Sequence, residues 1–164
     1  MQVHVPNLED EVKTALRNVA GVCGGKCDRE WTTAIKREFI RLGKEKRYQV
    51  CAGGFPGECE KEWLYDLVWY RNEPAEHLRE VGLIMESEWS RVPAYVRYDF
   101  EKLLIAKSPV KVMVFSEYRK NLPELWAMLG KAIECFKTEP AQENYILAGW
   151  DSSRHEFEFR TIPA

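Results

Sequence analysis

Val81-Gly-Leu-Ile-Met-Glu-Ser-Glu-Trp-Ser90 is an apolar run that ends in two glutamates two residues apart. Side chains at i and i+2 of a strand share a face, so Glu86 and Glu88 are expected to point the same way at the end of a sheet. Two carboxylates held there repel each other unless a positive charge lies between them, and a divalent metal ion is the usual one. The alternative is a strand that leaves the core and simply becomes polar.

The composition fits one globular domain. The chain has 164 residues, of which 45% are hydrophobic and 12% aromatic, enough for a full core. No run reaches the roughly 18 apolar residues that cross a bilayer, and no signal peptide is evident, so we expect a cytoplasmic protein with no membrane partner. Five irregularly spaced cysteines argue against a disulfide framework. The net charge of -2 provides no global basic field, so any contact with nucleic acid must come from a local patch.

Hydrophobic periodicity predicts the secondary structure. Helices are expected at 7–19, 28–42, 94–106 and 121–136, and strands at 47–52, 62–70, 78–88, 110–115, 145–150 and 155–162. Asn7 and Asp28 are expected to cap the first two helices, and Asn121 to open the last one with a capping box. This order predicts a mixed α/β fold in a single domain, with a central mixed β-sheet flanked by helices.

Three acids interrupt the apolar patterns. Glu38 falls within the apolar stripe of the second helix, Asp66 is the single charge in the apolar run of the second strand, and Glu86 ends the third. A glutamate on such a stripe either reaches solvent or faces a polar site. Acids that defy the folding pattern are expected at functional sites. Together they predict oxygen ligands for Mg²⁺ or Mn²⁺, whose usual use is hydrolysis or transfer at phosphate.

Basic and aromatic residues lie near these acids in the sequence. Arg37, Arg41 and Lys44 recur at helical spacing on the opposite side of the second helix. Such a ridge suits phosphate, and the alternative is an ordinary solvated helix face. Among the tryptophans, Trp89 beside the acids is the one placed to stack on a base.

The order of elements and the acids resemble the PD-(D/E)xK nuclease superfamily, whose restriction-endonuclease-like core has a helix, three strands, a helix and a fourth strand. The resemblance covers residues 28–116, with an N-terminal helix and Gly/Cys loop at 7–27 before it and a C-terminal helix and β-hairpin at 117–164 after it. The superfamily carries an acid on the second strand, an acid-x-lysine on the third and often a glutamate on the first core helix. Asp66, Glu86 and Glu38 match these positions.

The departure is Glu88, which stands where the lysine is expected. In some members of the superfamily a lysine of the following helix takes over, and Lys102 is the candidate here, with Lys107 second. The resemblance implies that Asp66 and Glu86 hold one or two Mg²⁺ ions and that Glu88 completes the coordination or orients the water. It also implies that Lys102 stabilises the charge on the pentacovalent phosphorane, while Glu38 holds a second metal ion or its waters.

The substrate implied by the resemblance is nucleic acid, DNA before RNA, with Arg37, Arg41 and Lys44 taking its phosphates. A homodimer is also implied, because many relatives cut duplexes as dimers, although nothing in the sequence marks a dimer face. Two alternatives stay open. One is an inactive nuclease-fold domain that binds protein or nucleic acid, and the other is an unrelated α/β interaction domain whose acids are merely solvated.

Overall fold

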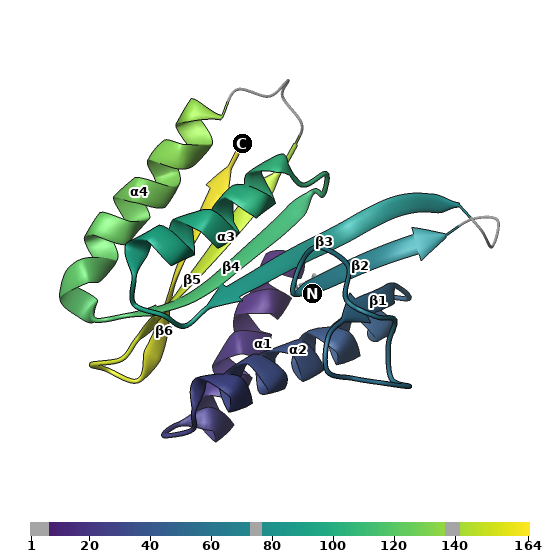
Figure 1. The fold of residues 1–164 in the computed structure, drawn as a ribbon, viewed down its shortest axis with the longest axis horizontal. Helices are drawn as coiled ribbons and strands as arrows, with labels where there is room; N and C mark the ends of the chain where they lie inside the picture. Colours follow the sequence, from purple (N-terminus) through teal and green to yellow (C-terminus); the bar gives the residue numbers. More distant parts are fainter. Residues whose placement is uncertain (1–6, 73–76, 137–141) are drawn as a thin grey trace, which may run out of the picture.

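One six-stranded mixed sheet, with strand order β1-β2-β3-β4-β5-β6, runs through the molecule (Figure 1). The computed structural model describes residues 7–72, 77–136 and 142–164. Its strands are β1 (Gln49–Ala52), β2 (Leu67–Asn72), β3 (Leu78–Glu88), β4 (Val110–Glu117), β5 (Asn144–Asp151) and β6 (Glu156–Pro163). The pairs β3/β4 and β4/β5 are parallel, and the other neighbouring pairs are antiparallel. The predicted mixed α/β fold in one domain is confirmed.

Two pairs of helices cover the two faces of the sheet (Figure 1). One face carries α1 (Leu8–Cys23) and α2 (Asp28–Glu45); the other carries α3 (Pro93–Ile105) and α4 (Leu122–Cys135), with a short 3₁₀ turn η1 (Arg119–Asn121) before α4. Alternation along β3 sends Leu83 and Met85 into the core under α1 and α2, and Ile84 into the core under α3 and α4. No helix in the described ranges combines the length and the apolar character needed to cross a membrane.

The carboxyl ends of β3, β4 and β5 meet at one edge of the sheet because these strands are parallel. Strand β2 runs the other way, so its first residue, Leu67, lies at the same edge opposite Met85. Ligands of open α/β sheets bind outside the carboxyl ends of the strands. We call this edge the carboxyl edge.

The bounds of β3 are those predicted, whereas the predicted strand at 62–70 is wrong in its first half. Strand β2 begins only at Leu67. Trp63 and Leu64 are 48% and 78% exposed, so they do not lie on a sheet face. The carboxylate of Glu62 accepts hydrogen bonds from the Gly53 N–H and from a lysine of α2, which holds this segment against the loop after β1.

The predicted helix caps are partly right. The side chain of Asn7 accepts the Asp10 N–H at 2.9 Å, which confirms the first cap. Asp28 was expected to cap α2 but is its first residue, and Cys27 is the cap. The capping box at Asn121 is wrong, because its amide donates instead to a carboxylate at the end of β4. All five cysteines are free thiols, in agreement with the absence of a disulfide framework.

Candidate functional site

Asp66 lies directly before β2 at the carboxyl edge and is held from two sides. Its Oδ2 accepts hydrogen bonds from the Ser87 N–H at 2.9 Å and from the Ser87 hydroxyl at 2.7 Å. Its Oδ1 lies 3.3 Å from Nζ of Lys36, which comes from α2. The carboxylate is therefore fixed between β3 and α2, close enough to Glu86 for its charge to act on that group.

Glu86 is a buried carboxylate, only 2% exposed, on the face of β3 that is covered by α3. Nζ of Lys102 lies 2.8 Å from its Oε1 and 3.0 Å from Oδ1 of Asp99, so the lysine bridges two acids. Oε1 receives no well-directed hydrogen bond from the described residues, and the contact with Lys102 is an ion pair. The ammonium of Lys102 thus points at Glu86, as a lysine that replaces the strand lysine would have to do.

Burial raises the pKa of Glu86 to about 8. The Lys102 ammonium opposes this shift, while the negative charges of Asp66 and Asp99 add to it. Partial burial works against the charge of Lys102, but its two carboxylate partners outweigh this and raise its pKa. Burial also raises the pKa of the Tyr65 hydroxyl, with Glu86 contributing, which places this phenol near the same charges. Because burial is the main cause of the raised pKa, ionisation of Glu86 is costly here unless a cation shares its charge.

Glu88 shares a face with Glu86, as the spacing predicts. Glu86 and Glu88 pair with Met113 and Phe115 of β4, which both lie in the core under α3 and α4. Oε1 of Glu88 accepts the Ser90 N–H at 2.6 Å, so this carboxylate closes the turn after β3. Glu88 therefore makes only a local hydrogen bond in the described part of the chain. The positive charge at Glu86 comes from Lys102.

Glu38, expected beside a metal, binds a neighbour on its own helix instead. Its two oxygens lie 2.7 and 3.0 Å from the guanidinium of Arg41, three residues further along α2. The side chain of α2 that reaches Asp66 is Lys36, which is 6% exposed and also pairs with Glu62 at 3.0 Å. Helix α2 therefore contributes a positive charge to Asp66, where an acid was expected.

A carboxylate triad is not formed. Within the ranges described, no three His, Cys, Asp or Glu side chains are grouped so that they could hold one metal ion. A metal ion held by Asp66 and Glu86 would need water or substrate oxygens for its remaining ligands, as Mg²⁺ commonly does.

The basic ridge of α2 is partly neutralised. Arg41 forms ion pairs with Glu38 and Glu45, so its positive charge is neutralised. Arg37 stacks over the ring of Phe55 at 5.5 Å, and Lys44 donates to the carbonyl oxygen of Glu58. Of the three predicted phosphate contacts, only Arg37 and Lys44 pair with no carboxylate in the described part of the chain.

Lys36 is the site residue that the sequence pattern missed. It lies within the apolar stripe of α2, next to Ile35 and one turn before Ile40. A lysine on such a stripe needs a buried partner for the same reason as Glu38. Applied to both residues, that rule would have identified Lys36 as a candidate.

Comparison with protein-family models, curated proteins and solved structures finds no match. The function of this chain therefore has to be inferred from its site.

Proposed function

We propose that this protein is a metal-dependent phosphodiesterase that acts on nucleic acid, with Asp66 and Glu86 as ligands of Mg²⁺ or Mn²⁺. The observation that carries the proposal is the buried Glu86 carboxylate, which lies at the carboxyl edge against the ammonium of Lys102 and within electrostatic reach of Asp66. A fold that only needed a core would place an apolar residue there, since a buried ion pair seldom adds stability over apolar packing.

The element order gives further support. The chain contains, in order, helix α2, strands β1 to β3, helix α3 and strand β4. This order of a helix, three strands, a helix and a strand is the one expected of a PD-(D/E)xK nuclease core. Asp66 adjoins the second of these strands, Glu86 lies on the third, and Lys102 lies on the following helix. The burial of Glu86 disfavours the alternative in which the acids are merely solvated.

The roles of the residues follow from their contacts. A bound Mg²⁺ ion would supply a Lewis acid at the scissile phosphate and lower the pKa of a coordinated water. Asp66 supplies an oxygen ligand whose orientation Ser87 and Lys36 fix. Asp99 is a second partner that would keep Lys102 at the site if Glu86 bound a metal ion. The charge of Lys102 then stabilises negative charge that develops on the phosphate.

A second candidate is a domain that binds without cleaving. It is favoured by the Lys102 bridge, which already supplies a cation to Glu86, and by the absence of a third grouped ligand among the described residues. In that case Glu86 and Lys102 would be a structural ion pair at a binding surface.

Cleavage assays with Mg²⁺ and Mn²⁺ on plasmid, single-stranded DNA and RNA test the proposal. We expect Asp66→Asn, Glu86→Gln and Lys102→Met each to lower the rate by about a hundredfold or more. Glu101→Gln and Lys131→Met are matched controls, because both residues are exposed and each pairs with a neighbour on its own helix. Activity that survives Asp66→Asn and Glu86→Gln would refute the assigned site, and absence of cleavage by the parent protein would favour the binding domain.

A further inference from the structure

A small pocket opens at the carboxyl edge on the other face of the sheet, the one covered by α1 and α2. Its volume is about 210 Å³. Three tryptophans, three basic residues and two serines form most of its wall. We call it the tryptophan pocket; its lining residues are Gly25, Lys26, Asp28, Trp31, Trp89, Arg91, Ser116, Trp150, Ser152 and His155.

The aromatic side of the tryptophan pocket is rigid. The ring of Trp31 lies 5.2 Å from that of Trp89 and 4.6 Å from that of Trp150. Trp31 and Trp150 are almost fully buried, whereas Trp89 is partly exposed. The indole N–H of Trp89 donates to the Thr32 hydroxyl at 2.9 Å, which fixes the ring plane. A fixed and partly exposed indole is a platform on which a planar ring can stack.

The pocket also carries positive charge that forms no ion pair among the described residues. Arg91 donates to the hydroxyls of Ser152 at 3.2 Å and Tyr118 at 3.4 Å. In the described part of the chain, neither Arg91 nor Lys26 pairs with a carboxylate, and Asp28 is the one acid that lines the pocket. An arginine held by hydroxyl groups keeps its charge available to an anion.

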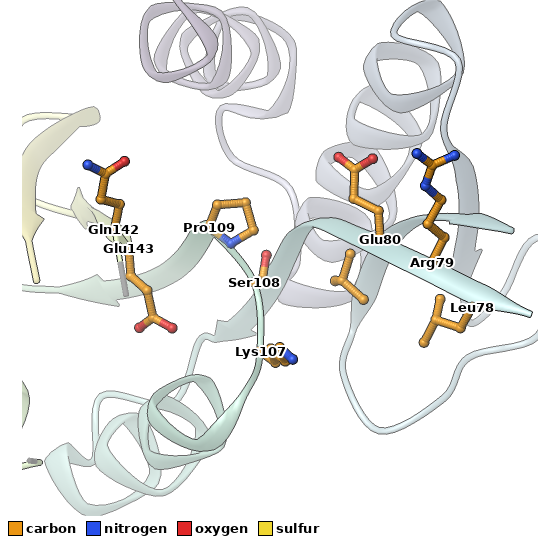
Figure 2. Close-up of a pocket in the computed structure, with 9 residues that line it drawn as sticks. Leu78, Arg79, Glu80, Lys107, Ser108, Pro109, Gln142 and Glu143 are labelled. Carbon is orange, nitrogen blue, oxygen red and sulfur yellow. The ribbon is translucent and has the colours of Figure 1, made fainter. Parts of the chain in front are cut away.

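One other polar cavity of this protein differs in this respect. The cavity of about 460 Å³ in Figure 2 lies at the far ends of the strands, between the start of β3, the segment before β4 and Glu143. Its carboxylates are already engaged, Glu80 by Arg71 and Glu143 by the buried Lys111 at 2.6 Å. The tryptophan pocket differs from this cavity because it combines a partly exposed indole with cations that pair with no carboxylate among the described residues.

We propose that the tryptophan pocket binds one unpaired nucleotide of a single-stranded nucleic acid, with the base stacked on Trp89 and the phosphate held by Arg91 and Lys26. At about 210 Å³, below the roughly 300 Å³ at which pockets for drug-sized ligands begin, the pocket admits one base and leaves the sugar and phosphate at its mouth. A base that remains paired cannot present its face to an indole, so the pocket selects single strands or frayed ends. His155 and the two serines supply further hydrogen-bonding groups for the phosphate.

The inference rests on the proposed function, because the nucleotide in this pocket would belong to the strand that is bound at Glu86. Trp89 follows Glu86 by three residues, a distance of about 10 Å along an extended chain. A nucleotide in the tryptophan pocket would therefore be a neighbour of the one at Glu86, with the strand crossing the carboxyl edge between them.

Binding of labelled oligo-dT, oligo-U and a duplex, measured by fluorescence anisotropy, tests the inference. The parent is the Glu86→Gln variant in EDTA, so that no strand is cut. We expect single strands to bind more tightly than the duplex, and Trp89→Leu and Arg91→Gln each to raise Kd about tenfold. Trp89→Phe retains a ring and should bind nearly as the parent does. Trp63→Leu is the matched control, because this half-exposed tryptophan packs on Tyr70, away from the pocket.

Unchanged binding by both Trp89→Leu and Arg91→Gln, equal affinity for the duplex, or no binding by the parent would overturn the inference. Near-parent binding by Trp89→Phe shows that a loss in Trp89→Leu is not a folding defect. The two oligonucleotides decide between DNA and RNA as the source of the nucleotide. The binding assay contains no metal and is independent of cleavage, so failure of the nuclease proposal appears as binding here with no cleavage by the wild-type protein in Mg²⁺ or Mn²⁺. Failure of the pocket appears as cleavage by the wild-type protein with binding indifferent to Trp89 and Arg91.

Discussion

Glu86 has a carboxyl group whose ionisation the fold opposes, since burial raises its pKa to about 8. An acid with a raised pKa in the folded state favours the protonated form there. Its contribution to stability is complete below the unfolded pKa, near 4.5, and is lost as the pH rises through about 8. In the absence of metal, the free energy of unfolding should therefore decrease as the pH rises from about 4.5 to about 8.

The variant Glu86→Gln removes this titration. We expect its free energy of unfolding in EDTA to rise relative to that of the wild type as the pH goes from 5 to 8.5, by on the order of a few kcal/mol. Urea denaturation at the two pH values measures the difference, with Glu101→Gln as an exposed control on α3. Parallel changes in wild type and Glu86→Gln would contradict the raised pKa of Glu86.

Lys36 gives a second prediction at this scale. Lys36→Met would leave Asp66 and Glu62 without their common partner. We expect a loss of about 1–3 kcal/mol, less than for a fully buried pair because both acids have partial access to water. The midpoint of urea denaturation measures it, and Lys131→Met should leave the midpoint nearly unchanged because Lys131 is exposed. A Lys36→Met protein as stable as the wild type would show that this ion pair is not structural.

The comparison of Lys36 with Glu38 shows what the sequence pattern can predict of the site. The pattern singled out Asp66 and Glu86, and the resemblance to PD-(D/E)xK nucleases added Lys102; the structure brings all three to the carboxyl edge. The pattern could not rank Glu38 against Lys36, because the choice depends on partners. Glu38 finds one three residues away on its own helix, a local pair that removes the need for a site. The partners of Lys36 come from the segment before β2, and only the tertiary fold brings them near.

At the scale of elements, β3 was predicted with its bounds, because its apolar run is continuous and ends in charges. The segment before β2 was wrongly predicted as strand, because Trp63 and Tyr65 alternate with other residues as the side chains on one face of a strand do. The ring of Trp63 packs on Tyr70 at 4.8 Å from within a loop. Apolar alternation therefore does not identify a strand by itself, because an apolar side chain of a loop can also pack on a strand, as Trp63 does on Tyr70.

Replacement by alanine should have opposite effects on stability at two helical glycines, Gly43 and Gly21. A Cβ on Gly43 of α2 would lie 2.6 Å from the indole nitrogen of Trp69, whose N–H is bonded to the carbonyl of Phe39. Overpacking against this buried ring should cost about 1–3 kcal/mol and outweigh the gain in helix propensity. Gly21 of α1 has nothing within 4 Å of such a Cβ, so Gly21→Ala should stabilise by about 0.5–1 kcal/mol. Thermal denaturation of both variants measures the contrast, and a stabilising Gly43→Ala would show that the α2–β2 contact is looser than described.

At the scale of the whole molecule, the two cores share one sheet. Strand β4 sends Val112 and Val114 to one core and Met113 and Phe115 to the other. Loss of either core exposes the backs of the same strands, so both should unfold together. We expect a single transition in urea, with m of about 2 kcal/mol/M, coincident by far-UV circular dichroism and tryptophan fluorescence. Two separated transitions would show that the helical layers are independent.

Both outer strands of the sheet have protected edges. Strand β1 has only four residues, and the backbone of Glu60 bonds to its open side through Val50 and Ala52. Strand β6 places the charges of Glu156, Glu158 and Arg160 along the opposite border and ends in a proline. Short, covered or charged borders prevent one sheet from continuing into another. Self-assembly of this protein would therefore have to use helices or loops, and concentrated solutions should resist β-mediated aggregation.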